Sequence, residues 1–409
     1  MKVSFVNTSY HLGGAETVVR QLHFGLIEAG HQSRFYVAVG KAIPRLPGVV
    51  PMYPRLLSRL FYSRFHDLVE RGAPRDRWTD RTFRKIADDP SDVVHIHNFH
   101  GDYASLESLL YLAARKPVVW TFHRFWGITG GCDHPGNCRR YFESCGHCPR
   151  VNEWPLNGVD NTTEQLKKKR EMLTDAPIHI VSPSKHLART VAESPIGRNW
   201  KITYIPNGVN PNEFSYQRKH DAKFRQSLGL KPDATVVLIV NRNFQDTVKG
   251  YQTIRDALPM IDPRGVQFVF AGGNSDWAIR QLPGHFSCVD MGFVSSRSRI
   301  ADLYEAADIF LYASPGENFP CVILEAMSAQ CCVVSTPTDG VIEQIEHGVS
   351  GLIADGFQPA DLAHALSNAM SSLDKLRDYG QSARKRVDEN FTESGMIEAH
   401  LALYRSLVA

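Results

Sequence analysis

The fold is decided by the stretch Ile309-Phe310-Leu311-Tyr312-Ala313-Ser314-Pro315-Gly316-Glu317-Asn318-Phe319-Pro320-Cys321-Val322-Ile323-Leu324-Glu325-Ala326. A short apolar run, typical of a buried strand, ends at Tyr312 and is followed by a Pro-Gly turn. The next residues predict a helix that starts near Pro320, where proline is well tolerated. Strand, turn and helix in this order form one βα unit. Such units build parallel sheets with helices on both faces, so the stretch predicts an α/β fold.

Similar runs recur along the whole chain. In the first half we predict helices at Glu164–Leu173 and after Ser184. The strands predicted there are Val3–Asn7, Arg34–Ala38, Val93–His97, Pro117–Phe122 and His179–Ser182. The strands predicted in the second half are Thr235–Val240, Val266–Ala271, Ile309–Tyr312, Cys332–Ser335 and Gly351–Ala354.

The stretch 204–211 separates the two series of strands and is rich in Pro, Asn and Gly, so we expect a hinge there. The prediction is two doubly wound, Rossmann-like domains that face each other across a cleft, residues 1–205 and 206–390. Residues 391–409 are expected to form a C-terminal helix that packs back on the first domain.

Composition limits the classes of function. The 409 residues include 46 Lys plus Arg against 43 Asp plus Glu, a net charge of only +3, so we expect no nucleic-acid partner. No run of about 18 apolar residues occurs, and the start of the chain is too polar for a signal peptide. We therefore expect a cytoplasmic protein whose eight cysteines are reduced thiols or metal ligands.

Two motifs lie where ligands bind in α/β sheets, just after strands. Gly13-Gly14, at the start of a helix, would let the backbone approach a phosphate, although a tight βα turn needs glycine as well. Glu317 and Glu325 bracket the second motif. Glu325 reads either as a surface carboxylate or as a site residue, and its apolar surroundings favour the site, because carboxylates rarely lie unpaired in such runs.

Glu317 and Glu325 resemble the E-x7-E motif of family 4 retaining glycosyltransferases, which have the two-domain GT-B architecture. The stretches 340–343 and 348–352 resemble the rest of that family's donor-domain signature. The stretches 120–123, 129–132 and 182–186 resemble the branch that makes colanic acid, capsules and other exopolysaccharides.

The resemblance implies an acceptor-binding first domain and a donor-binding second domain. It places Glu325 on the donor ribose, backbone amides around Asn318 on the sugar hydroxyls and phosphate, and Glu317 beside the donor sugar. The residues expected to bind the donor are Gly13, Gly14, Asn318, Phe319, Pro320, Cys321, Val322 and Glu325.

The resemblance also implies that His123 lies over the sugar and the reacting centre, and the alternative is a polar residue that only ends a strand. Arg124 departs from the acidic residue usual after this histidine. Lys249 and Arg242 are expected to stabilise the charge of the leaving diphosphate, with Arg242 alternatively a solvated surface cation. No D-x-D triplet occurs, so we expect catalysis without a metal cofactor, and the family implies retention of anomeric configuration.

A loop over 130–150 holds four cysteines: Cys132, Cys138, Cys145 and Cys148. Four thiolates so close together predict one structural zinc ion, with His134 or His147 as possible substitutes for one cysteine. Two disulfides, or four unligated thiols, are the alternatives. We expect this loop to belong to the acceptor side.

Residues 55–85 mix aromatic and leucine side chains with many arginines. This pattern suits an interfacial helix on an anionic membrane, which would make the protein peripheral on the inner face of the plasma membrane. Equally, arginine stems could cover the helix's own core.

The sequence therefore predicts a glycosyltransferase that moves a sugar from a nucleotide sugar to a hydroxyl of a saccharide acceptor. We expect a lipid-linked acceptor in exopolysaccharide, capsule or O-antigen synthesis. The alternatives are a GT-B epimerase of sugar nucleotides, a phosphorylase, and a non-catalytic protein that binds sugar nucleotides.

Overall fold

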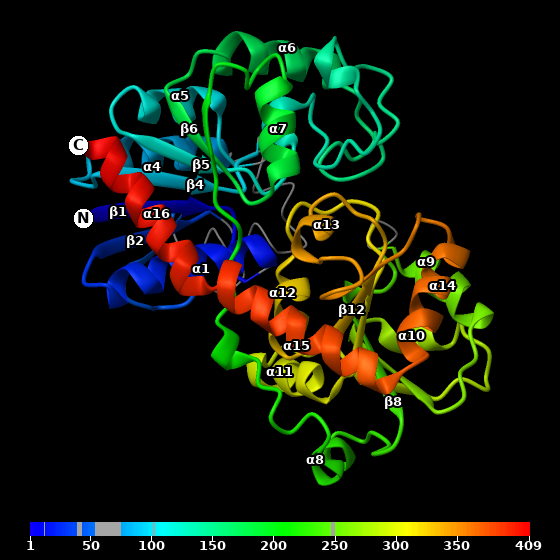
Figure 1. The fold of residues 1–409 in the computed structure, drawn as a ribbon. Coiled ribbons are helices and arrows are strands. Elements are labelled where there is room, and N and C mark those ends of the chain that lie inside the picture. The colour runs from blue at the N-terminus through cyan, green and yellow to red at the C-terminus, as the bar shows by residue number, and fades with distance from the viewer. Residues whose placement is uncertain (12, 39–42, 54–74, 101–102, 247–249) are drawn as a thin grey trace. The chain divides into compact units, whose positions relative to one another are not determined.

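A computed structural model describes residues 1–11, 13–38, 43–53, 75–100, 103–246 and 250–409. The chain divides into two compact units (Figure 1). The first consists of Met1–Pro206 together with Met396–Ala409, and the second of Asn207–Gly395.

The first unit is built on a parallel sheet of seven strands in the order β3-β2-β1-β4-β5-β6-β7. Their bounds are β1 Lys2–Asn7, β2 Gln32–Val37, β3 Val49–Pro51, β4 Val93–His97, β5 Val118–Thr121, β6 Ile178–Ser182 and β7 Lys201–Tyr204. Strands β1, β4 and β5 are almost wholly buried, as expected for the centre of a sheet covered on both faces.

Helices cover this sheet on both faces (Figure 1). They are α1 Gly14–Glu28, α4 Arg75–Asp88, α5 Leu106–Ala113, α6 Thr162–Leu173, α7 Lys185–Glu193 and α16 Glu393–Val408. Ser105 and Ser184 begin α5 and α7, because each hydroxyl accepts a hydrogen bond from a backbone N–H of the first turn. The C-terminal helix α16 packs against α1, where a methyl group on Gly25 would lie only 2.2 Å from Ile397.

The second unit has a parallel sheet of six strands in the order β10-β9-β8-β11-β12-β13. Their bounds are β8 Thr235–Asn243, β9 Val266–Gly273, β10 Cys288–Gly292, β11 Ile309–Tyr312, β12 Cys332–Ser335 and β13 Gly351–Ile353. Alternate residues of β8 enter separate apolar cores: Val236 and Leu238 enter one, and Val237 and Ile239 enter the other. The sheet is therefore buried on both faces.

The helices of this unit follow its strands in turn. They are α8 Ala222–Ser227, α9 Tyr251–Ala257, α10 Ser275–Ile279, α11 Arg297–Ala306, α12 Cys321–Ser328, α13 Val341–Gln344, α14 Pro359–Met370 and α15 Leu373–Asn390. The predicted α/β architecture of two doubly wound domains is confirmed. Every strand that the sequence predicted is present, within a few residues at each end.

Three strands were missed, namely β3, β7 and β10. Each lies at an edge of its sheet and pairs with a single neighbour. Strands β7 and β10 bury their residues only partly, and β3 has just three residues. An edge strand needs less apolar sequence than a central one, so its pattern is weaker.

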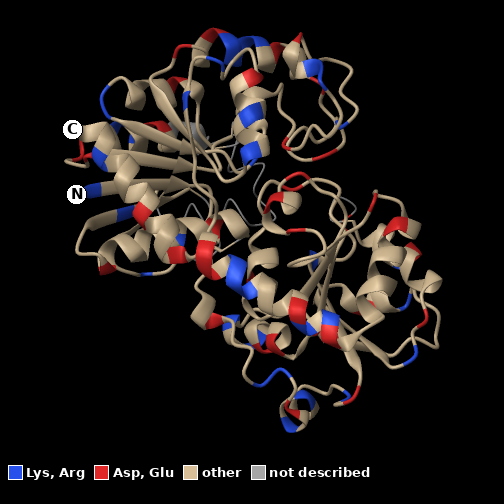
Figure 2. Cartoon of the chain, viewed as in Figure 1, with Lys and Arg blue, Asp and Glu red and all other residues tan. Residues whose placement is uncertain are grey.

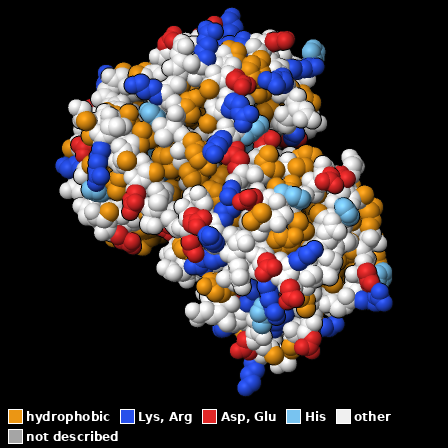
Figure 3. Space-filling view, viewed as in Figure 1, with side chains coloured by type: hydrophobic (Ala, Val, Ile, Leu, Met, Phe, Trp, Pro, Cys, Tyr) orange, Lys and Arg blue, Asp and Glu red, His pale blue; other side chains and the backbone are white. Residues whose placement is uncertain are grey.

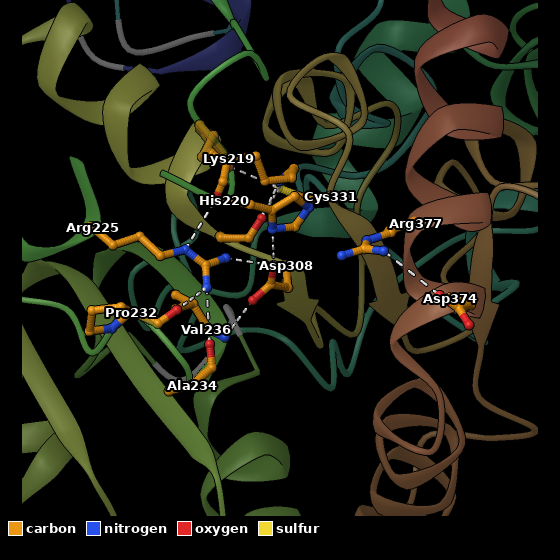
Figure 4. Close-up of polar contacts among 12 residues, drawn as sticks. Lys219, His220, Arg225, Pro232, Ala234, Val236, Asp308, Cys331, Asp374 and Arg377 are labelled. Carbon is orange, nitrogen blue, oxygen red and sulfur yellow. Dashed lines mark hydrogen bonds and ion pairs between the residues drawn. The ribbon is translucent and has the colours of Figure 1, made fainter. Parts of the chain in front are cut away.

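A buried polar cluster closes the amino ends of the strands in the second unit (Figure 4). Arg225, only 4% exposed, donates to the carbonyls of Pro232 and Ala234 and, over 2.7 Å, to Oδ1 of Asp308. Oδ2 of Asp308 accepts from the N–H of Val236 at 2.8 Å, which ties the start of β11 to the start of β8. The cluster lies at the strand ends opposite those where α/β sheets bind ligands, so its role is structural.

Charges of both signs are interspersed over the two units (Figure 2), and hydrophobic side chains lie among charged ones on the face drawn in Figure 3. Within the ranges that the structure describes, no helix is both long and apolar enough to span a bilayer.

Candidate active site

The loop between β11 and α12 lies at the carboxyl end of the central strand of the second unit. Side chains from elsewhere in that unit hold its carbonyl groups. Nδ2 of Asn207 donates to the carbonyl of Phe319 at 2.8 Å, and Nε2 of Gln344 donates to that of Pro320 at 3.0 Å. The hydroxyl of Thr338 donates to the carbonyl of Ser314. The loop therefore has one fixed course before any ligand arrives.

Two glycines permit the close packing of this loop. A methyl group on Gly340 would lie 1.2 Å from the carbonyl oxygen of Asn318, so only glycine fits there. Gly250 has a φ of 69° and lies under the start of the loop, where a methyl group would be 1.7 Å from the carbonyl oxygen of Ala313.

Glu325 lies within α12 and is 6% exposed. Its Oε1 accepts a 2.6 Å hydrogen bond from Nη1 of Arg297, the first residue of α11. Nε of the same guanidinium donates to Oε2 of Glu213 at 3.1 Å. Burial lowers the pKa of Arg297, but the two carboxylates outweigh burial and raise it above its usual value. Arg297 thus stays charged and fixes the orientation of the Glu325 carboxylate.

Helix α12 begins at Cys321, and the side chain of its N-cap residue Pro320 caps none of the first N–H groups. Asn318 and Phe319 are buried beside this helix start, and Val322 is partly buried. Burial, with the negative charge of Glu325 next in effect, raises the pKa of the Cys321 thiol to about 12, so it is protonated at neutral pH.

Glu317 lies in the loop and is half-buried. Its charge adds to burial in raising the pKa of Tyr312. It also raises the pKa of Cys321, as Glu325 does. The structure therefore brings Glu317, Cys321 and Glu325 together at one helix end, which is where the sequence analysis expected the donor.

Of the two cations predicted to face the leaving diphosphate, Arg242 is exposed near the end of β8. Its neighbour Asn241 packs closely on Gly272, where a methyl group would lie 1.7 Å from the Asn241 carbonyl oxygen. Lys249 lies outside the described residues, next to Gly250.

At the carboxyl edge of the other sheet, Gly13 is the N-cap of α1 and Gly14 its first residue, and both are exposed. Glu16, in the first turn, is 7% exposed. Its Oε1 accepts hydrogen bonds from Oγ of Ser9 and Nδ2 of Asn98, each at 3.2 Å. The glutamate therefore ties the glycine loop to the turns that follow β1 and β4.

His123 follows β5 at the same edge. Its Nε2 lies 2.9 Å from Nδ1 of His97, the last residue of β4, so one ring donates to the other. Burial, followed by the charge of Arg124, lowers the pKa of His123 to about 3. His123 is therefore a neutral imidazole at pH 7 that shares a hydrogen bond with His97.

A column of rings continues behind these two histidines. The ring centres of His97 and His95 lie 4.1 Å apart, and those of His95 and His400 lie 5.4 Å apart. Nδ1 of His95 lies 2.5 Å from the hydroxyl of Tyr404 in α16. Burial lowers the pKa of His95 and of His97 well below the usual value, and that of His400 to about 4.

The four cysteines of the loop, Cys132, Cys138, Cys145 and Cys148, form no disulfides. Within the described ranges, no group of three or more side chains is arranged to hold a metal ion. The tetrahedral zinc site therefore has no geometric support here and stays a prediction. His134 and His147 do not complete it either.

Other contacts supply the order that the sequence analysis ascribed to zinc. Nζ of the fully buried Lys169 donates to the carbonyls of Trp126 and Thr129, at 2.7 and 3.0 Å. The N–H of Gly146 donates to Oγ1 of Thr162 at 3.0 Å. Hydrogen bonds to α6 and its first residue therefore anchor the loop at both ends.

Most of the basic, aromatic segment 55–85 lies outside the described residues, which resume at Arg75. In α4, Phe83 and Ile86 are buried in the core of the first unit. The guanidinium of Arg84 lies over the ring of Tyr111, 5.7 Å from its centre. The described part of the segment thus packs on its own unit.

Known families match both units. The model of the family described as "Glycosyltransferase Family 4" matches residues 12–213. The model described as "Glycosyl transferases group 1" matches residues 234–372. The chain belongs to glycosyltransferase family 4. The resemblance seen in the E-x7-E motif is thereby confirmed, and the protein is a glycosyltransferase.

This transferase is similar to a putative colanic acid biosynthesis glycosyl transferase, WcaC, of Escherichia coli. The two are 23% identical over 373 residues, and the match covers 85% of each chain. It is 28% identical to an uncharacterized glycosyltransferase of Methanocaldococcus jannaschii, MJ1607, over 99% of this chain and 98% of the other. In fold it is similar to HepE of Anabaena, solved in complex with UDP and glucose, with a TM-score of 0.70, 18% identity and all of both chains covered. The GT-B fold expected from the sequence is confirmed.

Sequence reasoning missed Arg297, Asn207 and Gln344. Each lies in a different segment from the loop it supports and belongs to no motif. His97 carried a signal, because the alternation His95-Ile96-His97 in a strand places both histidines on one face of the sheet.

Proposed function

We propose that this family 4 glycosyltransferase moves a hexose from a nucleotide sugar to a hydroxyl of a saccharide, with retention of anomeric configuration. One observation carries the donor assignment: Arg297 holds the buried carboxylate of Glu325 within α12, the helix that begins at the carboxyl end of β11. A carboxylate accepts hydrogen bonds from two adjacent ribose hydroxyls, and the N–H groups and positive dipole of a helix start suit a diphosphate. HepE binds UDP and glucose, which makes a uridine diphosphate sugar the first donor to test.

In this proposal each donor residue has one role. Glu325 binds the ribose, and the buried loop at Asn318 to Cys321 binds the sugar and phosphate through its backbone. Glu317 lies beside the sugar. Gly13 and Gly14, which have no side chains, let the ligand approach the backbone at the start of α1. His123, neutral at pH 7, offers a hydrogen bond to the sugar without adding charge.

The leaving diphosphate gains negative charge as the bond to the sugar breaks, so cations must stabilise it. We assign this role to Lys249 and Arg242, and the sequence has no D-x-D triplet that would chelate a metal for it. Lys249→Ala is expected to lower kcat more than it raises the donor KM, because the added charge exists mainly in the transition state. Transfer is expected to be equal with and without a chelator, and a strict requirement for added magnesium or manganese would contradict this assignment.

The acceptor is proposed to be a lipid-linked saccharide in exopolysaccharide synthesis. The similarity to a putative colanic acid transferase, over 85% of each chain, supports this pathway. The exposed face of α4 carries Arg81, Arg84 and Lys85, which could contact anionic headgroups, so we propose peripheral attachment to the inner face of the plasma membrane.

A thermal-shift panel of UDP-, GDP- and ADP-sugars tests the donor assignment. A ligand at 100 times its Kd stabilises the protein by about 2.7 kcal/mol. Glu325→Gln should abolish most of the shift given by the accepted donor, since it replaces a charged acceptor with a neutral amide. A full shift in this variant would remove Glu325 from the site. Donor hydrolysis separates an enzyme from a non-catalytic protein that only binds sugar nucleotides.

A further inference from the structure

Trp154 is unusual among the tryptophans of this protein. All six lie in the described ranges, and Trp154, at 46%, is the exposed one. Tryptophan is highly buried on average, and its amphipathic ring is enriched where proteins contact ligands and partners.

The exposure does not come from a loose loop. The N–H of Glu153 donates to the carbonyl of Arg150 at 2.9 Å, and the two side chains form an ion pair at 2.9 Å. The N–H of Gly158 donates to the carbonyl of Val151 at 2.7 Å. Leu156 is 8% exposed and fills the space beside Gly131, where a methyl group would lie 2.8 Å from its Cδ2. The loop is thus anchored on both sides of Trp154.

Two side chains from the carboxyl edge of the sheet contact the indole. The ring of the buried His100 meets it edge-on, 5.2 Å away at 85°, and the guanidinium of Arg124 lies over the indole, 5.5 Å from its centre. Nη1 of Arg124 donates to Oδ2 of the buried Asp133 at 2.5 Å, which fixes the guanidinium. Arg124 directly follows His123, so the exposed indole belongs to the same edge of the sheet as that histidine.

We propose that Trp154 is a stacking platform for a pyranose ring of the acceptor saccharide. A pyranose has an apolar face of C–H groups and a rim of hydroxyls. The indole matches the face, and the half-exposed guanidinium of Arg124 supplies hydrogen-bond donors for the rim. The proposal rests on the proposed function, because it names the acceptor's place in the first unit. It also gives a role to Arg124, which departs from the family's usual acidic residue.

The test compares Trp154→Ala, Trp154→Phe and the control Val159→Ala. Val159 is a second exposed apolar residue of the same loop, at 61%. The probes are methyl α- and β-pyranosides of glucose, galactose, mannose and glucuronic acid. Saturation-transfer difference NMR measures their binding, and transfer from the donor selected by the thermal-shift panel measures their use as acceptors.

We expect Trp154→Ala to raise the ratio of acceptor KM to donor KM at least tenfold and to abolish the NMR signal of the bound glycoside. Trp154→Phe should recover part of both, and Val159→Ala should match the wild-type protein. An unchanged KM ratio in Trp154→Ala, or no binding of any probe to the wild-type protein, would overturn the platform. Binding that depends on Trp154 without any transfer would instead refute the proposed function and leave the platform standing.

Discussion

Arg297 and Glu325, which stand 28 positions apart in the sequence, meet in a 2.6 Å hydrogen bond between Nη1 and Oε1. The guanidinium thereby occupies one oxygen of the carboxylate and fixes the direction of the other. Glu325 belongs to the E-x7-E motif, whereas Arg297 belongs to none. The motif therefore depends on a residue that its own spacing does not reveal.

Replacing Arg297 by methionine should leave Glu325 buried without its charged partner. Loss of a charge-assisted hydrogen bond costs about 1.5–3 kcal/mol, so the donor Kd should rise by roughly one to two orders of magnitude. Glu213→Gln is the matched control, because Glu213 contacts the same guanidinium on its exposed side and such pairs contribute about 0–1 kcal/mol. Calorimetric titration with the accepted donor measures both. Equal affinities in the two variants would contradict the role given to Arg297.

Gly340→Ala should weaken donor binding without unfolding the second unit. The new methyl group would lie 1.2 Å from the carbonyl oxygen of Asn318, so the loop before α12 must move. We expect at least a tenfold rise in donor Kd. Gly284→Ala is the control, because no atom lies within 4 Å of the added methyl group. A donor Kd that is the same in both variants would show that the course of the loop does not matter for binding.

Acid should destabilise the first unit through its buried histidines. Burial lowers the pKa of His400 to about 4, so the folded chain binds fewer protons than the unfolded chain between that value and about pH 6.5. This contribution is fully present above pH 6.5 and is lost as the pH falls toward 4. Between pH 6.5 and 5 it amounts to about 2 kcal/mol for one histidine.

His400→Leu isolates that contribution. Between pH 7 and 5, the free energy of unfolding should fall more steeply with pH for the wild-type protein than for His400→Leu. The difference between the two slopes should correspond to the uptake of roughly one proton on unfolding. Urea unfolding, monitored by hydrogen exchange of the β4 amides, reports on the first unit. Parallel pH profiles would argue against a neutral, buried His400.

Arg225→Met should destabilise the second unit strongly. It leaves Asp308 largely buried without its 2.7 Å partner, and breaking such a pair typically costs about 3–5 kcal/mol. Arg377→Met is the control (Figure 4), because Arg377 is exposed and its Nη1 lies 3.8 Å from Oδ1 of the exposed Asp374. This variant should change the free energy of unfolding by less than about 1 kcal/mol. Differential scanning calorimetry compares the two. Similar melting temperatures would mean that the buried cluster contributes little.

The central strands and the helices that follow them could be predicted from the sequence because their pattern is local. Strands β8 and β11 are continuous apolar runs that are buried on both faces, and Pro320 marks the start of α12. The edge strands β3, β7 and β10 could not be predicted, because a strand with one neighbour needs little apolar sequence.

The same distinction holds for the candidate active site. Spacing within one βα unit placed Glu317 in the loop before α12 and Glu325 within the helix, because the eight positions that separate them allow few backbone conformations. The partners of these residues, and the column of rings that joins His123 to Tyr404, come from segments as far as 309 residues apart. Four clustered cysteines predicted a zinc ion, whereas the sequence did not reveal the hydrogen bonds that Lys169 donates to the loop and that Thr162 accepts from it. The periodicity of a sequence predicts local secondary structure and which face of it is buried. It does not predict which distant segments come into contact, so only the tertiary structure decided those contacts.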